Sequence, residues 1–327
     1  MNIVIVGIAV LMGCAVGWSI GANDAANSLG VAVGSKVLTL RKALVLICIF
    51  GFLGAVLQGQ YVCQTIGTEI VAIDKLSPSM KGHMAMVAAF GAFVWVLLAT
   101  YWKMPISTSH SIVGAVAGAG LAIHEPVNWK VLGGVFVCWI ATPLGSAVIA
   151  FALYFVLSRV FHKIVPVRHA EKILGVLIVV SGCYVAFTWG ANDVANTVGV
   201  ISFCGILNPT TSLILGGIAI VLGVVTWGYK VIETIGSELV DLLPLMAFSA
   251  QLASAINVHL YTVLGVPVST SHSIVGAVVG VGLVRGARVV NAGIMREIVV
   301  CWLATPFVSG VISFGMLKVM VLLLHLT

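Results

Sequence analysis

Charged residues are scarce in this 327-residue chain. Asp, Glu, Lys and Arg together make up 8% of it, whereas hydrophobic residues make up 61%. A soluble domain usually carries about 25% charged residues, which it needs to cover its surface. The composition therefore disfavours a cytosolic enzyme, a nucleic-acid-binding protein, a secreted scaffold and a disordered chain. A mean hydropathy of +1.18 instead predicts an all-α protein that crosses a lipid bilayer several times.

The sequence also lacks the patterns of a metal or redox centre. Its seven cysteines include no C-x-x-C pair and fall within apolar runs, which favours a packing role over zinc or redox chemistry. We therefore expect no cofactor. The Lys and Arg residues lie between the apolar runs, a distribution that fits membrane topology better than nucleic-acid binding. The first run has no basic start and no clear cleavage site, so we interpret it as a span and not as a signal peptide.

Four sequence blocks occur twice in the same order. GANDAANSLG (21–30), for example, returns as GANDVANTVG (190–199). The other pairs are 64–69 with 233–238, 105–114 with 267–276, and 137–143 with 300–306. Such repetition indicates a duplicated unit. We expect a first transmembrane repeat at 1–158, a cytoplasmic linker at 159–172 and a second repeat at 173–327.

Each half contains about five apolar runs long enough to cross the membrane, which makes ten in the chain. Because five is odd, the second copy is expected to be inverted relative to the first. The charges agree: 35–42 holds three basic residues and its counterpart 204–211 none, while 285–296 holds three arginines and 124–128 none. The positive-inside rule then places 35–42, 159–172 and 285–296 in the cytoplasm and both termini outside. Inverted repeats are typical of secondary transporters.

The GAND segments are expected to break their helices. The first apolar run covers 32 residues, about 48 Å as one straight helix, which exceeds the hydrocarbon thickness of about 30 Å. Gly and Asn are poor helix-interior residues, so the break is predicted at 21–27 and at 190–196. A broken helix at membrane depth lines a cavity, where its freed carbonyl groups can bind cations.

Asp24 and Asp193 are the residues of these segments with the clearest chemistry. An ionised carboxylate inside the bilayer costs several kcal/mol unless it is paired, and neither GAND block contains Lys or Arg. A bound cation or a proton is the natural partner. The alternative is that each Asp caps a helix by accepting backbone N–H bonds, which is compatible with cation binding.

The two P-[IV]-S-T-S-H blocks are predicted to be helix starts that bind an anion. A helix N-terminus offers free N–H groups and the positive end of a dipole, and neighbouring hydroxyl groups donate further hydrogen bonds. The hydroxyl residues concerned are Ser107, Thr108 and Ser109 in the first copy, and Ser269, Thr270 and Ser271 in the second. The alternative is that they bond back to their own helix. The runs at 104–123 and 264–284 either span the membrane or re-enter it.

His110 and His272 follow these hydroxyls directly. Adjacent residues do not face each other on a helix, so the pattern does not predict a hydrolase; packing, hydrogen bonding or proton handling remain open for the histidines. Gln64 and Glu233 occupy equivalent positions of the repeated block, and here the two copies differ. Glu233 is either a further cation or proton site, with Gln64 as its neutral partner, or an ion-pair partner of Lys230.

These motifs resemble the inorganic phosphate transporter (PiT) family, which has a GANDVANS-like sequence in each of two inverted repeats. The resemblance covers nearly the whole chain and implies phosphate uptake coupled to sodium or protons. It places Asn23 and Asn192 with the aspartates at the cation sites. Other repeated polar residues are added as candidates for phosphate binding: Asn27, Asn196, Thr65 and Thr234. The long central insertion of many relatives is absent, as in a minimal prokaryotic member, and Gln64 departs from the Glu that relatives often carry there.

The expected function is a symporter in the plasma membrane that alternates access to a midplane site, with phosphate, the coupling cation and lipid as its partners. The resemblance also suggests a homodimer. Three alternatives remain open: a sulfate permease of the same fold, a proton-coupled carrier of metal–phosphate complexes, and a passive anion channel. The embedded aspartates argue against the channel, which has no need of them.

Overall fold

The protein is a bundle of helices. The computed structural model describes residues 3–34, 36–73, 76–102, 106–203, 205–229, 232, 243–285 and 292–324. In the first half the helices are α1 (Ile3–Asp24), α2 (Ala26–Gly34), α3 (Leu40–Gln58), α4 (Gln60–Gln64), the π-helix η1 (Thr65–Glu69), α5 (Pro78–Tyr101), α6 (Thr108–Ala122) and α7 (Trp129–Ile164). In the second half they are α8 (Val167–Phe203), α9 (Pro209–Gly223), the π-helix η2 (Val224–Gly228), α11 (Pro244–Val263), α12 (Thr270–Arg285) and α13 (Ala292–Leu324).

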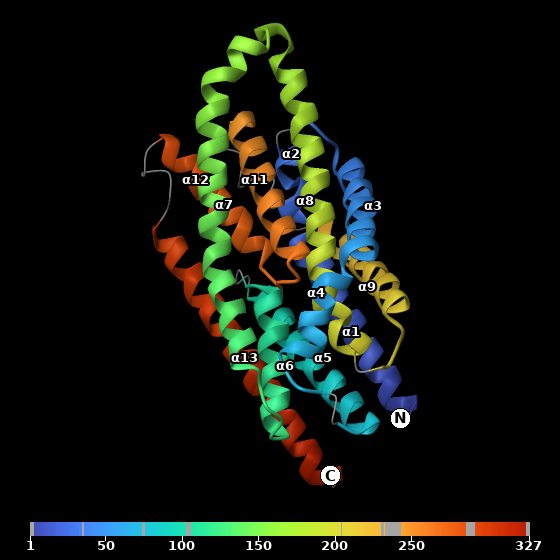
Figure 1. The fold of residues 1–327 in the computed structure, drawn as a ribbon. Helices are drawn as coiled ribbons and strands as arrows, with labels where there is room; N and C mark the ends of the chain where they lie inside the picture. Colours follow the sequence, from blue (N-terminus) through green and yellow to red (C-terminus); the bar gives the residue numbers. More distant parts are fainter. Residues whose placement is uncertain are drawn as a thin grey trace.

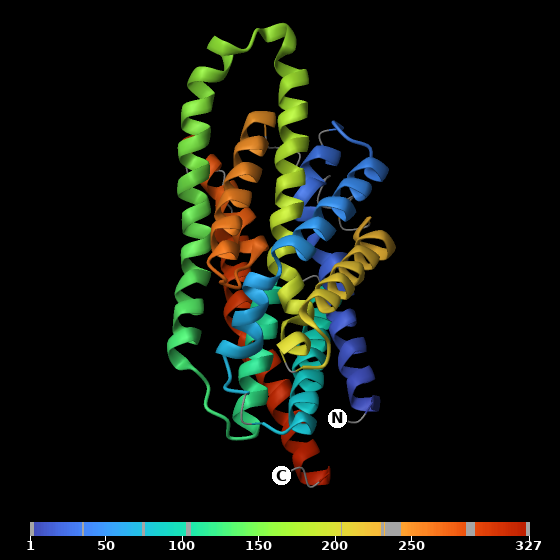
Figure 2. The same cartoon turned by 45° about the vertical axis from the view of Figure 1, so that its right-hand side comes forward.

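Both ends of the chain lie at the same end of the bundle. Figures 1 and 2 show the N-terminus and the C-terminus at the bottom, and the connection between the long helices α7 and α8 at the top. The segment expected to be a polar linker, 159–172, is largely helical, because α7 continues to Ile164 and α8 begins at Val167. Helices α5 and α6 lie in the lower part of the molecule and α11 in the upper part.

Seven helical stretches of the described chain are long and apolar enough to cross a membrane. They are Ile3–Gly30, Leu40–Gln58, Pro78–Tyr101, Trp129–Phe161, Val167–Ser202, Pro209–Gly228 and Val299–Leu323. The protein is therefore a multi-pass membrane protein. Three of the ten apolar runs expected to be spans form helices that do not meet this length and composition. Helices α6 and α12 have 15 and 16 residues, about 22–24 Å at 1.5 Å per residue, and α11 carries polar residues at Gln251, Asn257 and His259.

The predicted helix starts at the Ser-Thr-Ser segments are confirmed. Helix α6 begins at Thr108, and the side chain of Ser107 accepts a hydrogen bond from the backbone N–H of His110. Helix α12 begins at Thr270, and the side chain of Ser269 accepts from the N–H of His272 at 3.2 Å. Ser at this position satisfies one of the free N–H groups at the helix start.

The contacts between halves follow the sequence repeat. Helix α6 packs on α13 and helix α12 packs on α7. Gly114 of α6 lies directly against the backbone of Pro306, and its counterpart Gly276 lies against the backbone of Pro143. In each case a side chain would occupy the space of the neighbouring backbone, so glycine permits the close approach of the two helices. The short helix of each half is therefore held by the last long helix of the other half.

The expected helix break occurs in one GAND segment only. Helix α1 ends at Asp24, Ala25 forms a turn, and α2 begins at Ala26. Helix α8, by contrast, runs through 190–199 without interruption. The prediction of a second break is wrong because Asn192 uses its side chain on Thr262 and on the segment before α12. It does not compete with its own helical backbone, which is the effect that makes Asn a helix breaker.

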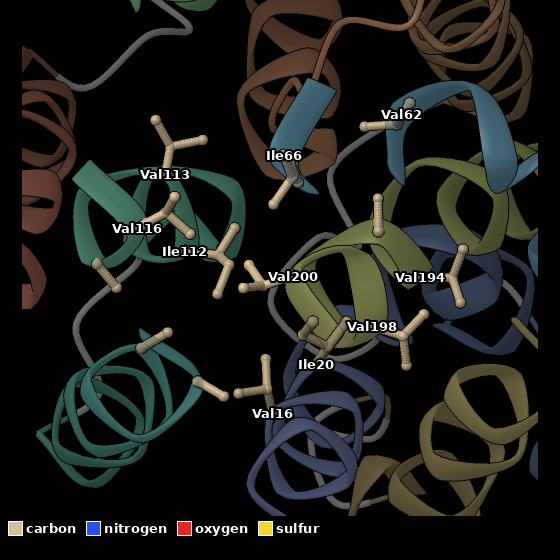
Figure 3. Packing of buried hydrophobic residues seen from close by; sticks show 14 of the residues in the cluster. Val16, Ile20, Val62, Ile66, Ile112, Val113, Val116, Val194, Val198 and Val200 are labelled. Atoms are coloured by element: carbon tan, nitrogen blue, oxygen red, sulfur yellow. The ribbon is translucent and has the colours of Figure 1, made fainter. Parts of the chain in front are cut away.

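Apolar residues from both halves form the interior around this point. Figure 3 shows Val200 of α8 between Ile112 of α6 and Ile66 of η1, and all three are buried members of one core cluster. Val16 of α1 lies below Val200 in the same view. This packing fixes the start of α6 and the GAND part of α8 relative to each other.

Candidate anion and cation site

The two aspartates and the two Ser-Thr-Ser segments come together in the middle of the molecule. Asp24 is 4% exposed and Asp193 is fully buried. Each carboxylate lies between the start of α6 and the start of α12, and each receives one hydroxyl group from both. The sequence placed these residues in four separate blocks, and the fold joins them in one polar cluster.

Asp24 is bonded by the middle hydroxyl of the first segment and the last hydroxyl of the second. Thr108 Oγ1 lies 3.5 Å from Asp24 Oδ2, and Ser271 Oγ lies 3.3 Å from Asp24 Oδ1. Asn27, three residues after the aspartate, donates from Nδ2 to Ser271 Oγ at 3.0 Å. Asn27 therefore orients a hydroxyl group that in turn faces the carboxylate.

Asp193 has a fuller set of partners. Ser109 Oγ lies 3.5 Å from its Oδ1, and Thr270 Oγ1 lies 3.4 Å from its Oδ2. Asn196 Nδ2 donates to Asp193 Oδ1 and to Ser109 Oγ, both at 3.0 Å. The pairing is exchanged relative to Asp24: the middle residue of one segment and the last residue of the other serve each carboxylate.

The starts of α6 and α12 also contact each other. Ser109 Oγ donates to the backbone carbonyl of Val268 at 2.9 Å. The positive ends of the two helix dipoles and their first N–H groups are therefore directed into one small region. Such a pair of helix starts favours negative charge.

Each histidine stacks on a tryptophan of its own half of the chain and lies near a tryptophan carbonyl oxygen of the other half. His110 stacks on Trp139 with ring centroids 3.6 Å apart, and His272 stacks on Trp302 at 3.4 Å. His110 Nδ1 is 3.0 Å from the carbonyl oxygen of Trp302. These contacts place both rings behind the hydroxyl groups, as the helical spacing predicted, and give them no nucleophile to activate.

Asn23 and Asn192 connect the GAND segments to the helix before each Ser-Thr-Ser segment. Asn23 Nδ2 donates to Thr100 Oγ1 at 2.9 Å, and Asn192 Nδ2 donates to Thr262 Oγ1 at 3.0 Å. Asn192 Oδ1 also accepts from the N–H of Val268 at 3.2 Å. The sequence analysis missed both threonines, although they occupy equivalent positions 162 residues apart in the two halves.

The repeated Thr-Ile-Gly block lies beside the cluster. Among the described residues, its Thr65 bonds to Glu69 and Gly265 and not to the aspartates or the Ser-Thr-Ser hydroxyls. Thr65 Oγ1 donates to the carbonyl of Gly265 at 2.7 Å, and Gln64 is exposed on α4. Thr65 therefore contacts the segment that leads into α12. Glu233, Thr234 and Lys230, which carried the corresponding expectations in the second half, lie outside the described residues.

The cluster contains both hydrogen-bond donors that suit an anion and carboxylates that suit a cation. Hydroxyl groups and helix N–H groups donate hydrogen bonds, while two carboxylates supply negative charge. Within the described part of the chain, the side chains that hydrogen-bond to the two aspartates are those of Ser, Thr and Asn. Neutral donors of this kind can bind an anion, but they do not balance the two carboxylates.

A multi-pass bundle with a buried polar cluster is typical of membrane transport proteins. The comparisons with known proteins specify it further. The sequence profile of the Phosphate transporter family matches residues 20–313. This chain belongs to that family.

Individual relatives agree with this assignment over nearly the full length of this chain. A candidate phosphate permease of Pyrococcus abyssi is 31% identical, with 96% of this chain and 97% of the relative aligned. The chloroplastic inorganic phosphate transporter 2-1 of Arabidopsis thaliana is 29% identical over 93% of this chain and 70% of its own. A solved structure described as the sodium-dependent phosphate transporter superposes with a TM-score of 0.88, at 31% identity, and covers 98% of this chain and 99% of that chain.

Proposed function

We propose that this protein is a symporter that takes up inorganic phosphate together with sodium ions, with protons as the alternative coupling ion. The observation that carries the proposal is the shared set of contacts: each buried aspartate is bonded by a hydroxyl group from both helix starts. Phosphate would bind to the hydroxyls and helix N–H groups, and cations would bind at Asp24 and Asp193. The sodium-dependent solved relative supports sodium as the first choice.

Charge balance explains why transport would be coupled. A phosphate dianion leaving water needs about two positive charges, and each helix start supplies only about half a charge. The carboxylates make this balance worse until cations bind to them. Phosphate affinity would therefore depend on cation occupancy, and by linkage cation affinity would depend on phosphate to the same extent.

We further propose that the two halves, 1–158 and 173–327, are inverted repeats joined at 159–172 and rock about this cluster. The termini at one end of the bundle and the α7–α8 connection at the other support this arrangement. So do the lengths of α6 and α12, which fit re-entrant hairpins. With the basic loops in the cytoplasm, both termini face the outside of the plasma membrane.

The test is radiolabelled phosphate uptake into proteoliposomes, with sodium and proton gradients imposed separately. Accumulation above equilibrium under a sodium gradient alone is expected; accumulation under a proton gradient alone would name the other ion. Uptake that only equilibrates under both gradients would mean a passive channel. Excess sulfate is included as competitor, and inhibition by sulfate as strong as by unlabelled phosphate would overturn the assignment of phosphate as substrate.

A further inference from the structure

The repeated block around Thr65 is not used by the central cluster, yet its last residue is an acid, Glu69, which is half-buried. Glu69 ends the π-helix η1, and Oε2 of its carboxylate lies 3.3 Å from Thr65 Oγ1. No ion pair of Glu69 occurs among the residues that the structure describes. A π-helical segment is rare and is frequently found at functional sites.

Glu69 lines a cavity. The cavity has a volume of about 510 Å³ and lies between η1 and the loop that connects α6 to α7. Its polar lining consists of Thr68, Glu69 and Asn128, and Val127 is among its apolar residues. Carboxylate, hydroxyl and amide oxygens are the ligands that hard cations prefer.

The cavity wall is held in place by backbone contacts on both sides. Asn128 N–H donates to the carbonyl of Ile70 at 2.9 Å, and Val71 pairs with Val127 in an isolated antiparallel bridge. Ile66 points into the apolar core between α6 and α8 (Figure 3), so the inner face of η1 is anchored. Thr68 and Glu69 thus remain on the side of η1 that lines the cavity.

The lysine that contacts the α6–α7 loop does not neutralise Glu69. Lys318 Nζ lies 3.3 Å from the carbonyl of Ala122 and 3.2 Å from His124 Nε2. The ammonium group of Lys318 is therefore held at the end of α6 and not beside Glu69. The carboxylate of Glu69 lines the cavity, and it accepts a hydrogen bond from the neutral hydroxyl group of Thr65.

A continuous series of polar contacts leads from Glu69 to the central cluster. Thr65 contacts Glu69 and donates to Gly265 O at 2.7 Å, and the next carbonyl, Val266 O, accepts from Asn192 Nδ2 at 3.3 Å. Asn192 immediately precedes Asp193. The segment 265–268 thus connects the cavity to the half of the site that contains Asp193.

We propose that Glu69, with Thr68 and Asn128, forms a peripheral sodium site at which the coupling ion binds before it reaches Asp193. This inference depends on the proposed function. In the proposed topology the α6–α7 loop faces outside, so the site would collect sodium from the medium from which phosphate is taken up. Glu69 is not part of the phosphate site.

The experiment compares Glu69→Gln with Glu125→Gln, which removes the same charge from the neighbouring loop but does not line the cavity. Two quantities are measured: equilibrium binding of ²²Na⁺ to the purified full chain without phosphate, and the sodium dependence of phosphate uptake. Glu69→Gln is expected to raise the half-saturating sodium concentration about tenfold in both, as for the loss of one charge-assisted contact. Glu125→Gln is expected to match the wild type, and Thr68→Val to show a smaller shift of the same kind.

A Glu69→Gln variant with wild-type sodium binding would overturn the peripheral site, as would an equal shift in Glu125→Gln. Asp24→Asn separates this failure from failure of the proposed function. If Asp24→Asn loses sodium-dependent uptake while Glu69→Gln behaves as the wild type, only the peripheral site is wrong. If Asp24→Asn retains sodium-dependent uptake, the proposed coupling itself is wrong.

Discussion

Asp24 and Asp193 occupy the same position of the repeated motif, but their surroundings differ. Asp193 lies in an uninterrupted helix, is fully buried and accepts a bond from Asn196 in addition to two hydroxyls. Asp24 is the last residue of α1, next to a turn, and the corresponding Asn27 donates to Ser271 and not to the carboxylate. One carboxylate is therefore held in a continuous helix and the other lies beside a turn, so the two proposed cation sites are not expected to be equivalent.

The interfaces beside the two GAND helices also differ, and again the second half has more hydrogen bonds. Between α8 and α11, Ser181 Oγ donates to Gln251 Oε1 at 3.0 Å, and the hydroxyl of Tyr184 lies 2.6 Å from His259 Nδ1. The equivalent positions between α1 and α5 are Met12 with Ala89 and Ala15 with Leu97, all apolar. Both interfaces contain one equivalent hydrogen bond, Asn23–Thr100 between α1 and α5 and Asn192–Thr262 between α8 and α11. The two further hydrogen bonds between α8 and α11 restrict sliding at positions where the α1–α5 contacts are apolar. We infer that α1 moves against α5 more readily than α8 moves against α11.

The largest expected effect separates the two aspartates. Asp24→Asn and Asp193→Asn should both abolish cation-dependent phosphate uptake in proteoliposomes, because each removes a charge that a cation balances. In ²²Na⁺ binding, Asp193→Asn should weaken affinity about 100-fold and Asp24→Asn about tenfold, or roughly 2.7 and 1.4 kcal/mol. The difference is expected because Asp193 is held by Asn196 in a continuous helix, whereas the turn after Asp24 lets neighbouring backbone groups replace a lost ligand. Equal losses of affinity would show that the two sites are equivalent after all.

A smaller effect is expected to be equal in the two halves. Gly114→Ala and Gly276→Ala each place a methyl group against the backbone of a proline in a neighbouring helix. Overpacking of this kind costs about 1–3 kcal/mol, so thermal unfolding in detergent should occur at lower temperature in both variants. Gly133→Ala and Gly315→Ala are matched controls, since a Cβ at these helical positions meets nothing within 4 Å. A clearly larger loss in one half would mean that the crossed packing is not symmetric.

Local sequence was enough to predict the duplication, the embedded aspartates and the helix starts at Ser107 and Ser269. These features depend on composition and on residues within a few positions of each other. The crossed pairing of hydroxyls and carboxylates was not predictable, because it depends on how α6 and α12 meet at Val268. The uninterrupted α8 was missed for the same reason: the partner that satisfies Asn192 is Thr262, 70 positions away.

The smallest expected effect tests the polar interface of the second half. Tyr184→Phe removes only the hydroxyl group that contacts His259. Hydrogen bonds between helices in membrane proteins contribute about 0.6 kcal/mol on average and up to about 1.7, so a modest decrease in the detergent unfolding temperature is expected, with phosphate uptake retained. Tyr101→Phe serves as the control because that side chain is 82% exposed and should leave the unfolding temperature unchanged. If Tyr184→Phe also unfolds as the wild type does, the α8–α11 interface gains no strength from this hydrogen bond. The greater rigidity of the second half would then have to come from Asn192 and Gln251 alone.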